Sequence, residues 1–393
     1  MPPALALFAA CQPGLEPFLA EELRALGATP QAQRGGVAFS GDTKLLLRAG
    51  LWLGTASHLL IRLTRFPCRA LGELERKARD LPWSSWLRPH VPMEVHATTR
   101  NSRIYHTGAA AERITNGIAA HMGRSLRAPA KDDEVFATVH VRLRDDECTI
   151  SFDATCDPLH RRGYRLDGRK APLREDLAHA LVLASGWRPG QALLDPFCGS
   201  GTIPIEAAAL AQGLPPGRLR APALQHLAVF EPEEWEAVRQ ERRPATPSQF
   251  LAGDRDSGAM VASRANAERA GVADAITWHE GAISTQPWLQ GSGAPAEGVV
   301  VTNPPFGLRV QKADGLLPLY QTLGRRIEGL GAGWRAAILA HDVRLCRRTG
   351  LPLKAAFTSK HGGITVTALV GSAVAVTERS PSQSNAGDDE VDD

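Results

Sequence analysis

Residues 193–206 read LLDPFCGSGTIPIE, from Leu193 to Glu206. An apolar run ends at Asp195, a Gly-x-Gly turn follows at Gly199 and Gly201, and an Ala-rich helical pattern begins directly after the turn. This order is typical of a strand, a tight turn and a helix. Glycines allow positive φ and the close approach of a ligand, and the start of a helix offers unpaired N–H groups. The stretch therefore predicts a nucleotide-type ligand in the crevice beyond the strand ends of a doubly wound sheet.

A second stretch, at residues 299–307, reads VVVTNPPFG. Its apolar run ends in Asn303-Pro304-Pro305-Phe306, and two consecutive prolines cannot continue a strand ladder, so the strand must stop there. The Lys-Ser/Thr pair of a phosphate-binding P-loop is absent after Gly201, which argues against ATP or GTP.

Together, the two stretches resemble the S-adenosylmethionine-dependent methyltransferases that act on exocyclic amino groups of bases. The match is closest to the THUMP-containing guanine-N2 RNA methyltransferases, in particular the bacterial 23S rRNA branch. Other segments fall in family order. These are Phe8-Ala9, Gly14-Leu15-Glu16, Arg100-Asn101-Ser102, His160-Arg161-Arg162-Gly163-Tyr164-Arg165 and Ser185-Gly186-Trp187.

The resemblance implies a Rossmann-like class I methyltransferase domain with S-adenosylmethionine as its cofactor. The residues expected at the cofactor are Asp195, Pro196, Phe197, Cys198, Gly199, Ser200, Gly201, Thr202, Asp254, Ala282 and Asn303. Asp195 is expected near the methionine end and Asp254 at the ribose hydroxyls, with Asp256 as a competing candidate that could instead cap a helix. Relatives usually carry an acid where Ala282 stands, and Glu280 or a backbone carbonyl could replace it.

The catalytic residues implied by the resemblance are Asn303, Pro304, Pro305 and Phe306. Guanine N2 is a poor nucleophile because its lone pair is delocalised into the ring. If the Asn303 side-chain oxygen and the Pro304 carbonyl accept its two hydrogens, the lone pair points at the methyl group. Phe306 offers a face for the base to stack on. Cys198 is interpreted as a packing residue, because the attacking atom belongs to the substrate.

Composition indicates a soluble protein of two or three domains, with 43% hydrophobic and 22% charged residues in 393. Six scattered cysteines without a Cys-x-x-Cys pair favour reduced thiols, no metal site and a cytoplasmic location. No apolar run is long enough for a membrane span. Lys and Arg number 45 against 42 Asp and Glu, and five of those acids lie in the last six residues, so the remaining chain is basic and suits RNA as a partner. We expect a monomer.

We expect an N-terminal ferredoxin-like α+β unit at 1–68, with helices at 15–26 and 42–53. A THUMP domain is expected at 69–155, with helices at 71–79 and 109–122 and strands at 94–99, 135–143 and 148–153. For its arginines, phosphate contact and a solvated face both stay open as interpretations.

Residues 156–172 are expected to form a basic linker. Its density of positive charge favours RNA contacts over a linker with a structural role only. The residues expected to contact RNA are Arg161, Arg162, Arg165, Arg169 and Lys170. Pro172 is expected in the first turn of a helix over 175–183.

The methyltransferase domain is expected at 173–376, followed by a disordered acidic tail at 377–393. Strands are expected at 192–195, 249–252, 275–279, 298–302, 335–340, 355–358 and 365–370. Helices at 202–212, 257–270 and 316–330, with a weaker helical stretch near Gln286, alternate with the earlier strands, as in a mostly parallel sheet covered on both faces. The last two strands are expected to form an antiparallel hairpin. Residues 213–247 are interpreted as an insertion.

Three functions remain open. The first is a guanine-N2 methyltransferase acting on 23S rRNA, with a tRNA guanine as second choice. The second is a DNA adenine-N6 methyltransferase, because the same Asn-Pro-Pro-aromatic chemistry serves adenine. The third, suggested by Ala282, is a binding module without catalysis. Related rRNA enzymes can carry a second methyltransferase domain, whereas this chain ends in an acidic tail, so a single reaction is expected.

Overall fold

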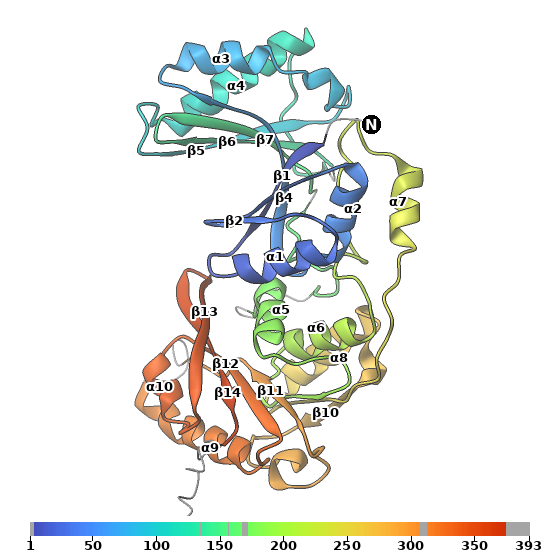
Figure 1. The fold of residues 1–393 in the computed structure, drawn as a ribbon, viewed down its shortest axis with the longest axis vertical. Helices are drawn as coiled ribbons and strands as arrows, with labels where there is room; N and C mark the ends of the chain where they lie inside the picture. Colours follow the sequence, from blue (N-terminus) through green and yellow to red (C-terminus); the bar gives the residue numbers. More distant parts are fainter. Residues whose placement is uncertain (1–3, 134, 156, 167–171, 307–312, 375–393) are drawn as a thin grey trace, which may run out of the picture.

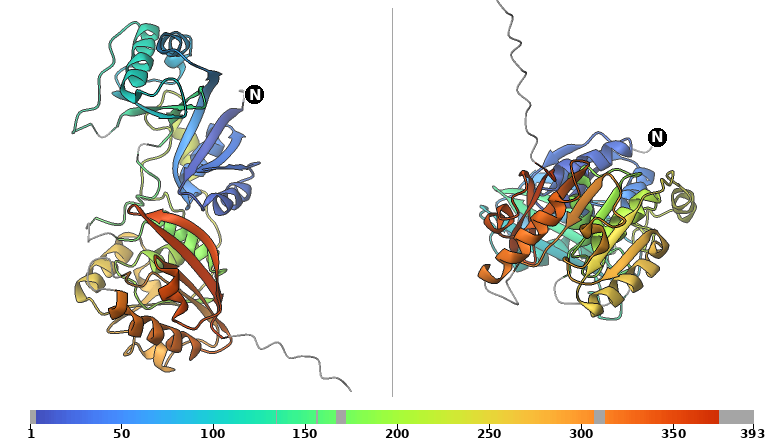
Figure 2. Two further views of the ribbon diagram at one scale, coloured as in Figure 1. Left: turned by 90° about the vertical axis from the view of Figure 1, so that its left-hand side faces the viewer. Right: turned by 90° about the horizontal axis from the view of Figure 1, so that it is seen from below.

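The computed structural model describes residues 4–133, 135–155, 157–166, 172–306 and 313–374. Three parts follow one another along the long axis (Figures 1 and 2). The part around α3 and α4 lies at one end, the part around α1 and α2 lies in the middle, and the part that contains α5, α6 and α8 to α10 lies at the other end. Within the described residues, no helix is long and apolar enough to cross a membrane.

The first two parts share one seven-stranded sheet, in the order β2-β3-β1-β4-β7-β6-β5. Its strands are β1 (Leu5–Cys11), β2 (Gln31–Gln33), β3 (Gly36–Gly41), β4 (Ala56–Pro67), β5 (Met93–Arg100), β6 (Ala137–Arg144) and β7 (Glu147–Asp153). The pairs are antiparallel except β5 with β6.

Sequence reasoning did not assign β4, the twelve-residue strand at the centre of this sheet. It pairs with β1 on one side and with β7 on the other, and so joins the first two parts into one body. Leu59 and Ile61 point into the core, while His58 and Arg62 lie on the opposite face. Charged residues interrupt the apolar alternation in β4, so its sequence pattern alone does not indicate a strand. The segment becomes a strand because it pairs with two neighbouring strands.

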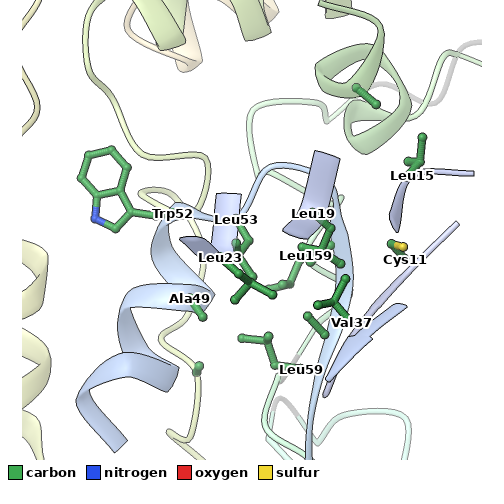
Figure 3. Close-up of a cluster of buried hydrophobic side chains, with 14 of the residues drawn as sticks. Cys11, Leu15, Leu19, Leu23, Val37, Ala49, Trp52, Leu53, Leu59 and Leu159 are labelled. Atoms are coloured by element: carbon green, nitrogen blue, oxygen red, sulfur yellow. The ribbon is translucent and has the colours of Figure 1, made fainter. Parts of the chain in front are cut away.

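Four helices cover one face of this sheet: α1 (Glu16–Ala25), α2 (Thr43–Trp52), α3 (Leu71–Arg79) and α4 (Thr107–Met122). All four match the expected helices closely. Asp42 caps α2 by accepting a 2.8 Å hydrogen bond from Leu45 N. Figure 3 shows the core beneath α1, where Leu19 and Leu23 lie with Val37 of β3 and Leu59 of β4. Each leucine buried in this way contributes roughly 1.5–3 kcal/mol.

The third part contains the second sheet, in the order β10-β9-β8-β11-β12-β14-β13. Its strands are β8 (Ala192–Asp195), β9 (Phe250–Asp254), β10 (Ile276–Glu280), β11 (Gly298–Thr302), β12 (Trp334–Ala340), β13 (Leu353–His361) and β14 (Ile364–Ser372). The first five strands are parallel, and β13 and β14 form an antiparallel hairpin at the edge, as expected. This is the expected Rossmann-like methyltransferase sheet.

The remaining helices are α5 (Glu175–Ala184), α6 (Thr202–Ala211), α7 (Pro232–Arg239), α8 (Ser257–Arg269), α9 (Leu317–Glu328) and α10 (Val343–Arg347), and all of them except α7 belong to this part. Short 3-10 turns occur at Trp83–Ser85, Ala273–Ala275, Pro287–Gln290 and Ala313–Leu316. The prediction for Pro172 was wrong. Arg174 precedes the first turn of α5, so Pro172 lies outside the helix.

The segment between α6 and β9, interpreted as an insertion, runs back along the first two parts. Its helix α7 packs beside α2, and Leu227 forms an isolated antiparallel bridge with Leu87 (Figure 1). The β13 strand reaches the middle part, where Phe357 meets Phe18 edge-on with ring centroids 5.6 Å apart. These contacts hold the middle part against the methyltransferase domain.

Candidate active site

The glycine turn and the double-proline loop meet at one edge of the second sheet. Because β8 and β11 are neighbouring parallel strands, their carboxyl ends lie side by side. The Thr302 hydroxyl at the end of β11 donates a 2.7 Å hydrogen bond to Asp195 Oδ1 at the end of β8. Both residues are fully buried. This bond fixes the two loops relative to each other.

Asp195 is prepared to bind a cation. Its Oδ1 accepts hydrogen bonds from Thr302 and from the Phe197 N–H, at 2.7 and 3.1 Å. Its Oδ2 is buried and has no partner among the described residues. Burial, and to a smaller extent the charge of Asp254, raise the pKa of Asp195 to about 7. An orphaned carboxylate oxygen of this kind fits the ammonium group of S-adenosylmethionine.

The glycines of the turn have different roles. Gly199 has φ +54°, and a Cβ built on it would meet nothing within 4 Å, so open space lies above it. Gly201 has φ +82°, and its Cβ would come within 3.0 Å of Ser263 Cβ on α8. Gly199 therefore leaves room for a ligand, whereas Gly201 allows the turn to pack on α8. The helix α6 begins at Thr202 and directs its first N–H groups into the same region.

The remaining residues of the turn are held by protein contacts. Pro196 is buried and Phe197 is half-buried. The Ser200 carbonyl accepts a 2.9 Å hydrogen bond from Asn266 Nδ2. Burial raises the pKa of the Cys198 thiol well above its usual range, and its sulfur lies 3.9 Å from that of Met260. These contacts support the interpretation of Cys198 as a packing residue.

Asp254 lies at the end of β9 and contacts the same turn. Its Oδ2 accepts from the Gly199 N–H at 3.0 Å, and its Oδ1 accepts from the Asp256 N–H at 3.0 Å. Asp256, the competing candidate, caps α8 by accepting a 2.8 Å bond from Ala259 N. The geometry therefore favours Asp254 over Asp256 as the acid beside the cofactor turn.

Sequence reasoning missed Gln286, which fixes the back of the turn. Its side chain is fully buried; Nε2 donates to the Pro196 carbonyl at 3.0 Å, and Oε1 accepts from Trp288 Nε1 at 3.1 Å. It lies directly over Gly253, where an added Cβ would approach it to 2.6 Å. The region was expected only as a weak helical stretch, and the polar residue in it gave no signal of burial.

Ala282 lies on the turn after β10 and is exposed. Its carbonyl accepts from the backbone N–H and the hydroxyl of Thr285, at 2.8 and 2.9 Å. Glu280 is also exposed and pairs in register with Asp254. The expected adenine contact at Ala282 remains a prediction.

The Asn-Pro-Pro-Phe loop presents a second orphaned acceptor. Asn303 Oδ1 is buried and has no partner in the described part of the chain. Pro304 is buried and Pro305 is exposed, and the Pro305 carbonyl accepts a long 3.4 Å bond from Tyr320. The ring of Phe306 is half-buried and lies 6.2 Å from that of His341. The unpartnered oxygen of Asn303 therefore lies one residue beyond Thr302, whose hydroxyl makes the hydrogen bond to Asp195.

The candidate RNA-binding residues of the basic linker differ in their exposure. Arg161 is exposed, and Arg169 and Lys170 lie outside the described residues. Arg165 is mostly buried and donates to Thr202 Oγ1 at 2.7 Å, at the start of the cofactor helix.

Arg162 does not fit an RNA-binding role. Its side chain is 2% exposed, and its guanidinium donates to the Gly54 carbonyl at 2.5 Å and pairs with Glu206 at 3.3 Å. The expectation of an RNA contact at Arg162 was wrong, because the charge is buried between the middle part and α6.

Arg162 belongs to a buried ionic network between these parts. His179 of α5 lies between two carboxylates, with Nδ1 3.0 Å from Glu206 and Nε2 3.3 Å from Glu22 of α1. Burial alone would lower the pKa of His179, but its hydrogen bonds to Glu206 and Glu22 raise it to about 9. Burial would likewise raise the pKa of Glu206, but the neighbouring charges of Arg162 and His179 lower it to about 2. The network ties α1 to the helix that begins at the cofactor turn.

Comparison with known proteins assigns the family. Residues 162–368 match the RMKL-like methyltransferase domain family, which covers more than half of the chain. The chain belongs to this family. Residues 6–60 match the RlmL ferredoxin-like domain and residues 68–153 match the THUMP domain. The expected family and fold, and with them S-adenosylmethionine as the cofactor, are confirmed.

The relatives include the ribosomal RNA large subunit methyltransferase K/L of Syntrophotalea carbinolica. It is 34% identical over 362 residues, which cover 88% of this chain and 50% of that protein. The chain thus spans about half the length of this curated relative.

Several solved structures share the whole arrangement. SMU.472, a putative methyltransferase complexed with SAH, aligns over 94% of this chain and 98% of its own, with a TM-score of 0.83 and 25% identity. A predicted N6-adenine-specific DNA methylase from Listeria monocytogenes aligns over 93% and 96%, with a TM-score of 0.82 and 29% identity. TrmN from Thermus thermophilus aligns over 93% and 98%, with a TM-score of 0.72 and 27% identity.

Proposed function

We propose that this protein transfers a methyl group from S-adenosylmethionine to the exocyclic N2 of a guanosine in large-subunit ribosomal RNA. The observation that carries the proposal is the position of Asn303. Its unpartnered Oδ1 comes one residue after the bond that joins the double-proline loop to the cofactor turn. The K/L methyltransferase relative and the THUMP match support RNA as the substrate.

Different residues of the chain bind the cofactor and orient the target base. The cofactor supplies an electrophilic methyl group when it is bound. Asp195 Oδ2 would accept a hydrogen bond from the ammonium group, and Gly199 leaves open space above the turn for the cofactor. Asp254, which accepts a hydrogen bond from the Gly199 N–H, would hold the ribose hydroxyls.

The base is oriented by the second loop. Asn303 Oδ1 and the Pro304 carbonyl accept the two N–H hydrogens of the target amine, which turns its lone pair towards the methyl group. This is catalysis by positioning and electrostatic stabilisation in a water-poor site, and it needs no protein nucleophile. Phe306 provides the stacking surface. A base-paired target would have to be flipped out of its helix.

Two other substrates remain alternatives. A tRNA guanine stays the second candidate, as the sequence left it. The predicted N6-adenine-specific DNA methylase of Listeria aligns with a TM-score of 0.82, and adenine N6 presents the same kind of amine. A binding module without catalysis would lack a reason to keep two buried acceptors, Asp195 Oδ2 and Asn303 Oδ1, without partners.

The test is methyl transfer from labelled cofactor to three substrates: large-subunit rRNA from a strain that lacks the protein, total tRNA, and DNA. Nuclease digestion and mass spectrometry identify the product base. N2-methylguanosine in rRNA alone is the expected result, whereas N6-methyladenine, or label in tRNA only, contradicts it. Asn303→Ala serves as the matched variant. It should lose at least about 100-fold in kcat.

A further inference from the structure

A third strand end lies beside the two loops of the candidate active site. The β12 strand pairs in parallel with β11, and Thr302 stands opposite Ile338 in that pairing. The residues that follow the two strands therefore leave the same edge of the sheet. The first residue after β12 is His341, which is half-buried. Neither the proposed binding of the cofactor nor the proposed orientation of the amine uses this side chain.

Three contacts fix His341 in this place. Ala340, the residue before it, pairs with β14. Asp342, the residue after it, caps α10 by accepting hydrogen bonds from two backbone N–H groups, at 2.8 and 3.2 Å. The ring itself is held by the β13–β14 hairpin, because its Nδ1 lies 2.8 Å from the Thr365 carbonyl oxygen.

The contact with Thr365 decides which ring nitrogen of His341 carries hydrogen. A carbonyl oxygen only accepts, so Nδ1 is the donor, and in the uncharged ring Nε2 has a lone pair and no hydrogen. Within the described residues, Nε2 makes no hydrogen bond. His341 therefore presents an oriented acceptor at the edge of the sheet.

This acceptor lies beside the proposed stacking surface for the base. The ring centroids of His341 and Phe306 are 6.2 Å apart, and the two ring planes are inclined at 58°. Asn303, whose unpartnered Oδ1 is the proposed partner of the amine, precedes Phe306 by three residues in the same loop. The imidazole thus borders the position proposed for the base.

The atoms beside the amine differ between the bases that carry one. In guanine, one of the two ring nitrogens next to the N2 amine, N1, carries a hydrogen. In adenine and cytosine, no ring nitrogen next to the amine carries one. An acceptor beside the bound amine therefore completes a hydrogen bond with guanine, whereas with adenine it sets two lone pairs against each other.

We propose that His341 is the residue that selects guanine over adenine, and that its Nε2 accepts a hydrogen bond from guanine N1–H while Asn303 and Pro304 hold the N2 amine. The inference rests on the proposed function for the reaction and for the position of the base. The acceptors of the Asn-Pro-Pro-Phe loop suit any exocyclic amine, so they do not distinguish the two purines. Selection comes from a side chain outside the loop, which the β13–β14 hairpin orients through the Thr365 carbonyl.

The test compares guanine with 2-aminopurine at the target position of a synthetic RNA built around the N2-methylguanosine site of the rRNA. 2-Aminopurine keeps the N2 amine, but its N1 has a lone pair in place of a hydrogen. Wild type should prefer guanine by at least about 100-fold in kcat/KM, because a site built around a hydrogen bond rejects an analogue that lacks it. In His341→Gln the preference should fall below about tenfold, since the amide can donate to N1 of 2-aminopurine as well as accept from guanine.

Two further variants complete the comparison. His341→Ala removes the acceptor and should lower the preference by reducing kcat/KM for guanine alone. Arg347→Gln, an exposed change on α10, is the matched control and should leave the preference within about twofold of wild type. Because every variant is given the same two bases, the effect of O6, which 2-aminopurine also lacks, cancels. Cofactor Kd and the thermal midpoint, measured on the same samples, show that the variants are folded.

A narrowed preference in both His341 variants, with the control unchanged, supports the inference. Equal use of both bases by wild type, or a preference that survives unchanged in both His341 variants, overturns it and leaves the proposed function intact. An equal fall of the preference in Arg347→Gln also overturns it. If wild type transfers no methyl group to guanosine in this RNA, the proposed function fails, and the role of His341 fails with it.

Discussion

Thr302 and Asp195 lie 107 residues apart in the sequence and are joined by a 2.7 Å hydrogen bond at the buried edge of the sheet. The bond links the strand end that enters the double-proline loop to the strand end that enters the glycine turn. Cofactor and base must meet within bond-forming distance, so the separation of these loops determines whether transfer can occur. The Thr302 hydroxyl adds a side-chain link at the strand ends to the backbone pairing of β8 and β11.

Removing this hydroxyl should weaken cofactor binding. Thr302→Val keeps the shape of the side chain but leaves Asp195 Oδ1 with one partner in place of two. A lost hydrogen bond to a buried carboxylate costs about 1.5–3 kcal/mol, so the Kd for the cofactor should rise roughly 10- to 100-fold. Titration calorimetry measures this. Thr302→Ser should stay close to wild type, and a Val variant with unchanged Kd would show that the bond does not position the site.

Cofactor affinity should depend on pH through Asp195. Burial and the charge of Asp254 raise its pKa to about 7, so the carboxyl gains a proton as the pH falls through 7 and can no longer pair with an ammonium group. The Kd should therefore rise between pH 7.5 and pH 6, by up to about tenfold per pH unit below the pKa. Asp195→Asn should bind weakly with a flat profile over this range. A wild-type profile as flat as that of the Asn variant would exclude Asp195 as the ammonium partner.

Gln286→Glu should destabilise the protein at the cofactor turn. A carboxylate cannot donate to the Pro196 carbonyl, and it adds a negative charge close to the buried Asp195. The expected loss is about 2–4 kcal/mol in the free energy of unfolding, from an unpaired carbonyl and a buried charge. Urea denaturation measures it. Gln290→Glu, an exposed change on the same 3-10 turn, is the control and should cost less than about 0.5 kcal/mol.

The two turn glycines should respond differently to alanine. Gly201→Ala must place a Cβ 3.0 Å from Ser263 at φ +82°, so it should lower the thermal midpoint clearly. Gly199→Ala adds only the strain of a positive φ, about 1 kcal/mol, but its methyl group enters the open space above the turn. It should lose more cofactor affinity than stability. Similar losses of stability in both variants would show that the space at Gly199 is not the ligand site.

The buried network should make stability depend on pH through His179. Its folded pKa of about 9 exceeds the unfolded value near 6.5, so its contribution is complete below pH 6.5 and is lost as the pH rises through 9. The shift corresponds to a contribution on the order of 3 kcal/mol. His179→Gln should be less stable at pH 6 and should lose this dependence. Denaturant midpoints at pH 6, 7.5 and 9 measure it, and equal slopes in both proteins would count against the network.

The local elements of the fold could be read from the chain. Apolar periodicity and glycine turns predicted α3, β8 and β11 with the bounds that the structure shows. These signals depend on neighbours within a few residues, which the sequence contains directly. The strand β4 was missed because its pattern is mixed and its pairing partners lie up to about 90 residues away.

The chain by itself determined the chemistry of the site: an acid after a strand, a glycine turn, and an amide followed by two prolines. Only the tertiary structure decided which charges are buried. Arg161 and Arg162 are neighbours in one basic run, yet Arg161 is exposed, whereas Arg162 is buried and pairs with Glu206. It likewise placed Gln286 behind the turn. Burial and charge pairing depend on segments distant in the chain, and no local pattern records which of two adjacent side chains will meet them.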